Sequence, residues 1–165
     1  MKQIVVYESQ TGFTKQYAQW IAESLICECV SRKDAEKYDL SSYDRIIYGG
    51  WMMAGQVYGL DKIRKLNVKN LVVFGVGMAP SREEIIKKLI VDNKLEGMPF
   101  YYFEGGYRPE KLNFIHRWMM NTIKKSLEKK RNKTEEDFFM LEAFDGKQKV
   151  CQEAVTDLVA YCKDF

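Results

Sequence analysis

The feature that most constrains this chain is a hydroxyl-rich turn directly after its first apolar run. The run Ile4 to Tyr7 is followed within two residues by Ser9-Gln10-Thr11-Gly12-Phe13-Thr14. Apolar residues then recur at helical spacing from Phe13 to Leu25. A strand that turns tightly into a helix leaves several backbone N–H groups pointing at one spot, with the positive helix end behind them. The sequence therefore predicts an anion-binding loop at this junction.

The residues of this turn indicate which kind of anion it would bind. The hydroxyls of Ser9, Thr11 and Thr14 can add donors, and Gly12 lets the backbone approach the anion closely. The turn contains no Lys or Arg, so it lacks the lysine of a triphosphate-binding Walker loop. A phosphate monoester held by neutral donors fits it better. The alternative is an ordinary Ser/Thr-rich turn that caps a helix.

Strand-like and helix-like segments alternate along the chain. Further strands are predicted at 26–31, 45–48, 71–74 and 99–103. Helical spacing follows Ser81 and Asp145, and residues 55–66 are predicted to form a loop with a short helix. This order predicts an α/β fold with a parallel sheet. A chain of 165 residues, 46% of them hydrophobic, fits one domain over 1–165.

The pattern [ST]-x-T-G-x-T at the end of the first strand resembles the FMN-phosphate loop of the flavodoxins, and the resemblance covers nearly the whole chain. It implies a flavodoxin-like, doubly wound, five-stranded parallel sheet of order 2-1-3-4-5, with helices on both faces. It also implies non-covalent FMN as the cofactor, with the phosphate on residues 9–14.

In a doubly wound sheet, ligands lie beyond the carboxyl ends of the strands, where the strand order reverses. The flavin ring is therefore expected beside the loop after the third strand, which holds Gly50, Trp51, Met52, Met53, Ala54 and Gly55. Trp51 offers the ring a flat apolar face. The next strand's loop, with Gly77 and Met78, would supply backbone groups. The alternatives are a partly buried surface tryptophan and glycines that only end a strand.

Two features differ from ordinary flavodoxins. Many of these stack a tyrosine of the fourth-strand loop on the flavin, but no aromatic residue stands between Gly75 and Arg82. Tyr107, after the fifth strand, is the nearest substitute. Ordinary flavodoxins are also strongly acidic, whereas this chain has a formal net charge of +3. Residues 108–133 hold nine Lys and Arg against two Glu, so this segment carries +7 and the remainder −4.

The basic segment lies in a predicted helical insertion, residues 104–146, between the fifth strand and the last helix. Apolar residues recur there at three- and four-residue steps, which predicts an amphipathic helix: Leu112, Ile115, Trp118, Met119, Ile123 and Leu127. Phe114, Trp118 and Met119 could roof the flavin site, with Arg108 and Arg117 facing the carboxylates of a substrate. The helix could instead lie on an anionic membrane, dock a redox partner, or pack on the domain with a solvated basic face.

Gly105-Gly106-Tyr107-Arg108, the basic helix and a strand-like run after Glu135 resemble one family in particular. These are the flavodoxin-like, quinone-linked protoporphyrinogen dehydrogenases. The resemblance rests on residues 104–146 and departs from that family at Asp145-Gly146, where an aspartate–tryptophan pair is common. The flavin would supply the chemistry. No catalytic acid or base is therefore expected, and the single histidine, His116, is given no catalytic role.

Three classes of function are consistent with these features. The first is an FMN-binding electron-transfer protein whose partner is a redox protein or a quinone. The second is an FMN-dependent protoporphyrinogen-type dehydrogenase with a quinone acceptor, and the third is a flavodoxin-shaped interaction protein without flavin. Reduced cysteines, no metal and no nucleic-acid partner are expected. The start at Met1 and the short apolar runs predict a cytoplasmic protein, with 108–133 able to hold it at the inner face of the membrane.

Overall fold

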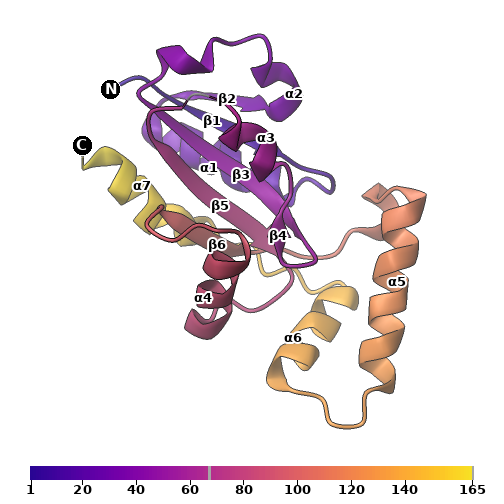
Figure 1. Ribbon diagram of the computed structural model, residues 1–165. Coiled ribbons are helices and arrows are strands. Elements are labelled where there is room, and N and C mark those ends of the chain that lie inside the picture. The colour runs from indigo at the N-terminus through magenta and orange to yellow at the C-terminus, as the bar shows by residue number, and fades with distance from the viewer. Residues whose placement is uncertain (67, 165) are drawn as a thin grey trace.

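The computed structural model describes residues 1–66 and 68–164. Its strands are β1 (Gln3–Glu8), β2 (Glu28–Ser31), β3 (Arg45–Met53), β4 (Gln56–Val57), β5 (Leu71–Gly77) and β6 (Phe100–Glu104). Five of them are parallel, in the order β2-β1-β3-β5-β6, and β4 pairs antiparallel with the end of β3 (Figure 1). Counted along the chain, the parallel strands have the predicted order 2-1-3-4-5. Only the short strand β4 was not expected.

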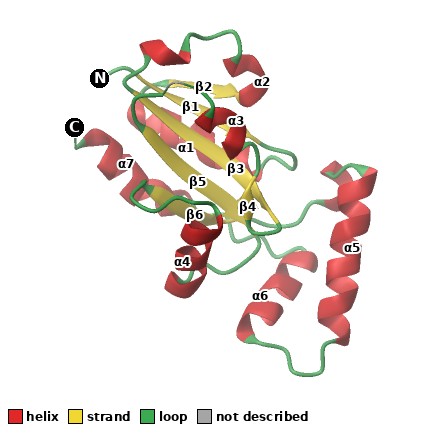
Figure 2. Cartoon of the chain, viewed as in Figure 1, coloured by secondary structure: helices red, strands yellow, loops and turns green. Residues whose placement is uncertain are grey.

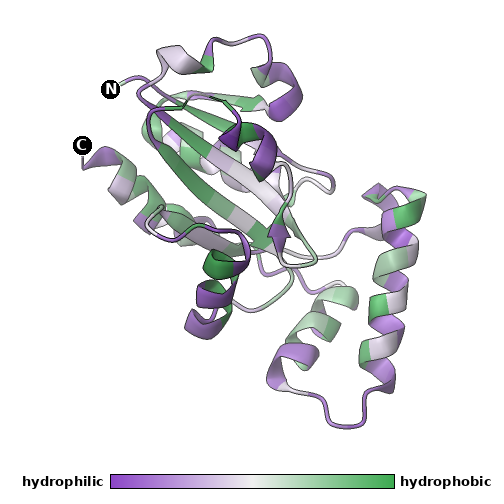
Figure 3. Cartoon of the chain, viewed as in Figure 1, coloured by the Kyte–Doolittle hydropathy of each residue, from purple (hydrophilic) through white to green (hydrophobic). Residues whose placement is uncertain are grey.

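Helices cover both faces of this sheet (Figure 2). The helix α1 (Phe13–Leu25) and the last helix, α7 (Thr156–Lys163), pack on one face. The other face is covered by α2 (Arg32–Ala35), α3 (Leu60–Arg64) and α4 (Glu83–Asp92). Short 3-10 turns lie at Leu40–Ser42, Pro109–Lys111 and Gln152–Val155. The strands are mostly hydrophobic along their length (Figure 3), as expected for a sheet buried on both faces. The α/β fold is therefore confirmed.

The insertion forms a helical hairpin beyond the carboxyl ends of the strands (Figure 1). Its helices are α5 (Phe114–Lys129) and α6 (Glu135–Phe144). The strand-like run predicted after Glu135 is wrong, because Thr134 and Asp137 form a capping box that starts α6. The last helix begins at Thr156 and not at Asp145. Within the described residues, no helix has both the length and the apolar character needed to cross a membrane.

The predicted loop after the third strand is also corrected. β3 continues to Met53, because β5 pairs with it as far as Trp51 and β4 pairs with Met52 and Met53. The glycines at 49 and 50 are explained by close contacts. A Cβ on Gly49 would lie 2.0 Å from Cζ of Phe74, and one on Gly50 would lie 2.5 Å from the carbonyl oxygen of Tyr58.

One buried amide fixes the β3–β4 hairpin. The Oδ1 atom of Asn93 accepts from the N–H of Val57 at 2.8 Å, and its Nδ2 atom donates to the carbonyl oxygen of Gly55 at 2.8 Å. Nδ2 also donates to the carbonyl oxygen of Leu89, in α4. Asn93 thus ties the hairpin that carries Trp51 to the end of α4.

Replacing Asn93 with Ala is expected to destabilise the protein by about 2–3 kcal/mol, because it leaves buried polar groups of the hairpin unpaired. Urea unfolding followed by circular dichroism measures this. The matched control is Asn132→Ala, at an exposed amide between α5 and α6, which should stay within about 0.5 kcal/mol of the wild type. Equal stability of the two variants would contradict the assigned role of Asn93.

Candidate functional site

A cavity of about 550 Å³ lies beyond the carboxyl ends of the strands. This volume is typical of small-molecule sites, and the position is where open α/β sheets bind ligands. Its walls come from the loop after β1, the ends of β3 and β5, and helices α4, α5 and α6. Eleven of the fifteen predicted site residues line it: Gln10, Thr11, Phe13, Thr14, Trp51, Met52, Ala54, Gly55, Gly77, Met78 and Tyr107.

The loop after β1 leaves the start of α1 open to a ligand. Gly12 has a left-handed backbone, with φ of +96°, and its N–H donates to Oγ of Ser9 at 3.1 Å. Helix α1 has no capping side chain and no acidic residue in its first turn. The N–H groups of Phe13 and Thr14, which start the helix, therefore have no partner within the helix. Such groups are suited to an anion.

A polar contact joins this loop to α5. The Nε2 atom of Gln10 lies 2.8 Å from Nδ1 of His116. The Oε1 atom of Gln10 is buried and has no hydrogen-bond partner among the described residues. A buried acceptor without a partner is costly, so this oxygen is suited to a hydroxyl of a bound ligand.

The loop itself has no cation, but the insertion brings two to it. Nη1 of Arg108 donates to the carbonyl oxygen of Thr11 at 3.0 Å, and its guanidinium lies over the ring of Phe13 at 3.9 Å. A Cβ built on Gly12 would lie 3.2 Å from Nη1 of Arg108 and 3.9 Å from Nζ of Lys111. Two cations therefore lie beside a loop that was expected to offer only neutral donors. The cations come from a segment almost a hundred residues further along the chain.

The end of β3 forms an aromatic wall. Trp51 stacks on Tyr58 with ring centroids 4.6 Å apart, and its ring meets that of His116 edge-on at 5.3 Å. Beside it, the side chain of Met52 lies over Gly77, where an added Cβ would be 3.0 Å from Cγ of Met52. The hydroxyl of Tyr102 donates to the carbonyl oxygen of Ala79 at 2.8 Å, which holds the turn after β5.

Helix α5 closes the outer side of the cavity, but only one of the three expected side chains, Met119, lines it. Leu112, just before the helix, and Met119 line the cavity, as do Met120, Ile123 and His116. Phe114 and Trp118 point away, with 83% and 66% of their surfaces exposed. Arg117 does not line the cavity, and its guanidinium donates to the carbonyl oxygen of Leu112. The predicted roof of Phe114 and Trp118 is therefore wrong, whereas Met119 lies as predicted.

Four predicted residues do not line the cavity. Ser9 and Gly12 belong to the turn beneath it, where they bond to each other. Gly50 is covered by Tyr58, and Met53 pairs with Gln56 in the β3–β4 hairpin. His116 was missed, because a single histidine on a basic helix carries no pattern that distinguishes it from a surface residue.

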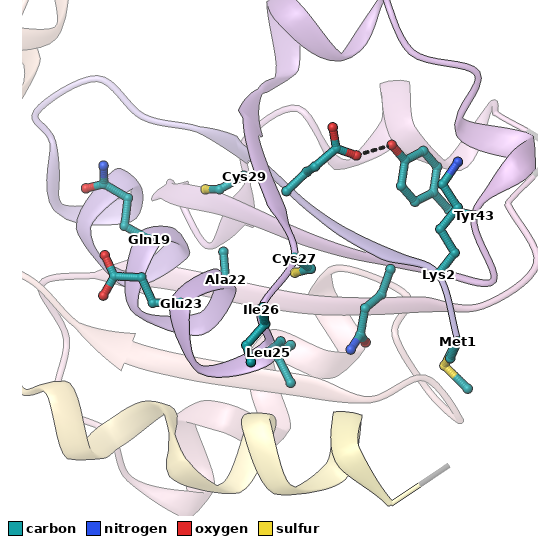
Figure 4. Close-up of a pocket in the computed structure, with 12 residues that line it drawn as sticks. Met1, Lys2, Gln19, Ala22, Glu23, Leu25, Ile26, Cys27, Cys29 and Tyr43 are labelled. Atoms are coloured by element: carbon teal, nitrogen blue, oxygen red, sulfur yellow. Dashed lines mark hydrogen bonds between the residues drawn. The ribbon is translucent and has the colours of Figure 1, made fainter.

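An open hollow of about 760 Å³ lies at the amino ends of β1 and β2 (Figure 4). Cys27 and Cys29 line it, and the hydroxyl of Tyr43 donates to the carboxylate of Glu28 at its edge. Burial raises the pKa of both thiols to about 11, so they stay protonated at neutral pH and are poor nucleophiles. This hollow lies at the amino ends of the strands, whereas open α/β sheets bind ligands beyond the carboxyl ends. It is therefore not the candidate site.

The model of the flavodoxin domain family matches residues 4–134 of the chain. Similar solved structures include a flavodoxin from the domain Archaea, 16% identical, covering 88% of this chain and 97% of that one, with a TM-score of 0.46. Flavodoxin 2 from Bacillus cereus is 22% identical over 74% and 96% of the two chains, with a TM-score of 0.44. A flavoprotein in complex with FMN from Lactobacillus acidophilus is 14% identical over 62% and 91%, with a TM-score of 0.43. No curated protein matches the chain.

Proposed function

The chain belongs to the flavodoxin domain family, and we propose that it binds one FMN non-covalently and transfers electrons through the flavin. The observation that carries this proposal is the uncapped, left-handed turn at the start of α1, which opens into the cavity beyond the sheet. When bound, the flavin accepts a hydride or single electrons. The protein's part is to bind the flavin, orient it and control its exposure to water.

The donor set fits the parts of FMN. The N–H groups of Phe13 and Thr14, with the hydroxyls of Thr11 and Thr14, would hold the phosphate. The unpartnered oxygen of Gln10 would accept from a ribityl hydroxyl. Trp51 would lie against the ring, and backbone groups near Gly77 would face its pyrimidine end.

FMN is expected to bind at least tenfold more tightly than riboflavin, because only FMN makes charge-assisted hydrogen bonds to the loop. Titrating the apoprotein with each flavin and following flavin fluorescence measures the ratio. Equal affinities would contradict the placement of the phosphate on residues 9–14.

Replacing Trp51 with Ala is expected to lower the affinity for FMN and for riboflavin by the same factor, about tenfold. Both ligands carry the isoalloxazine ring that Trp51 would contact. The control is Trp118→Ala, at a tryptophan that faces away from the cavity. If Trp51→Ala binds both flavins as tightly as the wild type does, another side chain lies against the ring.

A second candidate function is favoured by the walls of the cavity. A carrier needs the flavin edge exposed to its partner, whereas here α5 and α6 supply an apolar outer wall that includes Met119, Met120 and Met140. Such a wall suits a flat, apolar organic substrate. With the resemblance of residues 104–146, this supports an FMN-dependent dehydrogenase of protoporphyrinogen type with a quinone acceptor. Lys88 lines the cavity wall on α4, where its Nζ lies 4.0 Å from a carboxylate oxygen of Asp92, and it would meet a substrate carboxylate.

Anaerobic mixing of the FMN-loaded protein with protoporphyrinogen and a menaquinone analogue separates the two functions. The dehydrogenase predicts porphyrin fluorescence that rises faster than with free FMN and slows in Lys88→Gln, whereas Lys87→Gln, on the neighbouring exposed position, is unaffected. Absence of turnover, together with salt-sensitive reduction by a flavodoxin reductase, would contradict the dehydrogenase and support the carrier.

The outward face of α5 supports an anionic membrane surface as a partner, which would place the protein peripherally at the inner face of the membrane. Phe114, Ile115 and Trp118 are 83%, 70% and 66% exposed. Phe114, Trp118, Lys125 and Lys129 follow one line along the helix, since they are spaced by four, seven and four residues. Aromatic residues next to lysines are typical of helices that lie in a lipid interface.

Sedimentation with anionic vesicles is expected to bring down the protein, less so at high salt, whereas neutral vesicles should not. Trp118→Ser should weaken this binding severalfold. Val91→Ser, at an exposed apolar position on α4, is the matched control. Equal binding by the two variants, or no preference for anionic vesicles, would contradict this surface.

A further inference from the structure

Within the α5–α6 hairpin, α5 is held to the body with little buried apolar surface, whereas α6 buries Ala143 and Phe144, and the ring of Phe144 packs against that of Tyr107. No described residue of α5 is fully buried, and neither apolar cluster of the core includes one. Gln10 contacts His116 at 2.8 Å, and Arg82 on α4 forms an exposed ion pair with Glu135 at 2.8 Å. Elements with little buried apolar surface open at low free-energy cost. The position of α5 over the cavity therefore depends on few contacts, and the one between Gln10 and His116 lies at the loop after β1.

Arg108 and Lys111, at the base of the hairpin, have N–H donors left to bind a ligand. Arg108 uses one N–H for the carbonyl oxygen of Thr11 and one for Oε1 of Gln148, and a guanidinium has further donors. In the described part of the chain, no carboxylate forms an ion pair with Arg108 or Lys111. Both cations nonetheless lie within 4 Å of the Cβ position of Gly12. They therefore add positive charge where the N–H groups of α1 are already open to an anion.

We propose that Arg108 and Lys111 form a clamp for the phosphate monoester of the bound ligand, and that this contact closes the α5–α6 hairpin over the cavity. The inference rests on the proposed binding of FMN. It adds two cations that couple phosphate binding to closure of the hairpin, which a neutral loop would not do. Phosphate binding and hairpin closure are thermodynamically linked. The free energy by which the phosphate stabilises the closed hairpin equals the free energy by which closure strengthens phosphate binding. A flavin without phosphate fills the ring site and leaves the hairpin open more of the time.

Hydrogen exchange of amides in residues 111–134, measured with no ligand, with riboflavin and with FMN at saturation, tests the clamp. FMN is expected to slow exchange at least tenfold more than riboflavin does. In Arg108→Gln and in Lys111→Gln this difference should shrink severalfold. Each variant should also lose about tenfold in FMN affinity with riboflavin affinity unchanged. The matched control is Lys125→Gln on the outward side of α5, which should behave as the wild type.

Salt dependence of the wild type gives a second measurement that does not rely on a variant folding. A cationic clamp predicts that FMN affinity falls severalfold between about 50 mM and about 500 mM NaCl, while riboflavin affinity does not. Wild-type protein that does not prefer FMN to riboflavin overturns the proposed function and the clamp together. A preference for FMN that both variants retain, or equal hairpin exchange with both flavins, overturns the clamp alone and leaves the phosphate to the neutral loop.

Discussion

The site depends on a helix start that is both buried and uncapped. Phe13 and Thr14 are almost fully buried, so water has little access to the first N–H groups of α1. Gly12 has no side chain to cap them, and the hydroxyl oxygen of Ser9 already accepts from Gly12. Buried backbone donors are satisfied in native proteins. An anion at this position would satisfy them, and the end of β1 would fix where it lies.

The insertion converts an open loop site into a walled cavity. Helix α5 turns Met119 and Met120 toward the cavity and Phe114 and Trp118 toward solvent. One element thus walls the cavity and leaves two aromatic side chains exposed on its other side. Among the cations of this insertion, Arg108 and Lys111 lie beside Gly12, whereas Lys124 and Lys130 form ion pairs with Asp145 and Asp137. A carrier needs only an exposed flavin edge, and this wall is the feature on which the proposed dehydrogenase function rests.

The sequence was sufficient to predict what depends on local patterns. Alternating apolar runs predicted the parallel sheet, and the turn at residues 9–14 predicted an anion site at a strand–helix junction. Where two local patterns compete, the sequence was misleading. Residues 50–55 were predicted to form a loop, but β3 continues to Met53. Its two glycines do not end the strand, since Phe74 and Tyr58 occupy the space of the missing side chains. The apolar run after Glu135 suits a strand or a helix, and the capping box at Thr134 was the signal that decides. His116 and Arg108 reach the loop by tertiary packing, which no local pattern encodes.

In the proposed complex, the FMN phosphate lies at the start of α1 and the flavin ring lies in the cavity beyond β3 and β5. A crystal structure of the FMN complex tests this most directly. Phosphate oxygens are expected within hydrogen-bond distance of the N–H groups of Phe13 and Thr14, and the ring within van der Waals contact of Trp51. A flavin bound elsewhere on the molecule, or a phosphate in solvent away from residues 9–14, would contradict it.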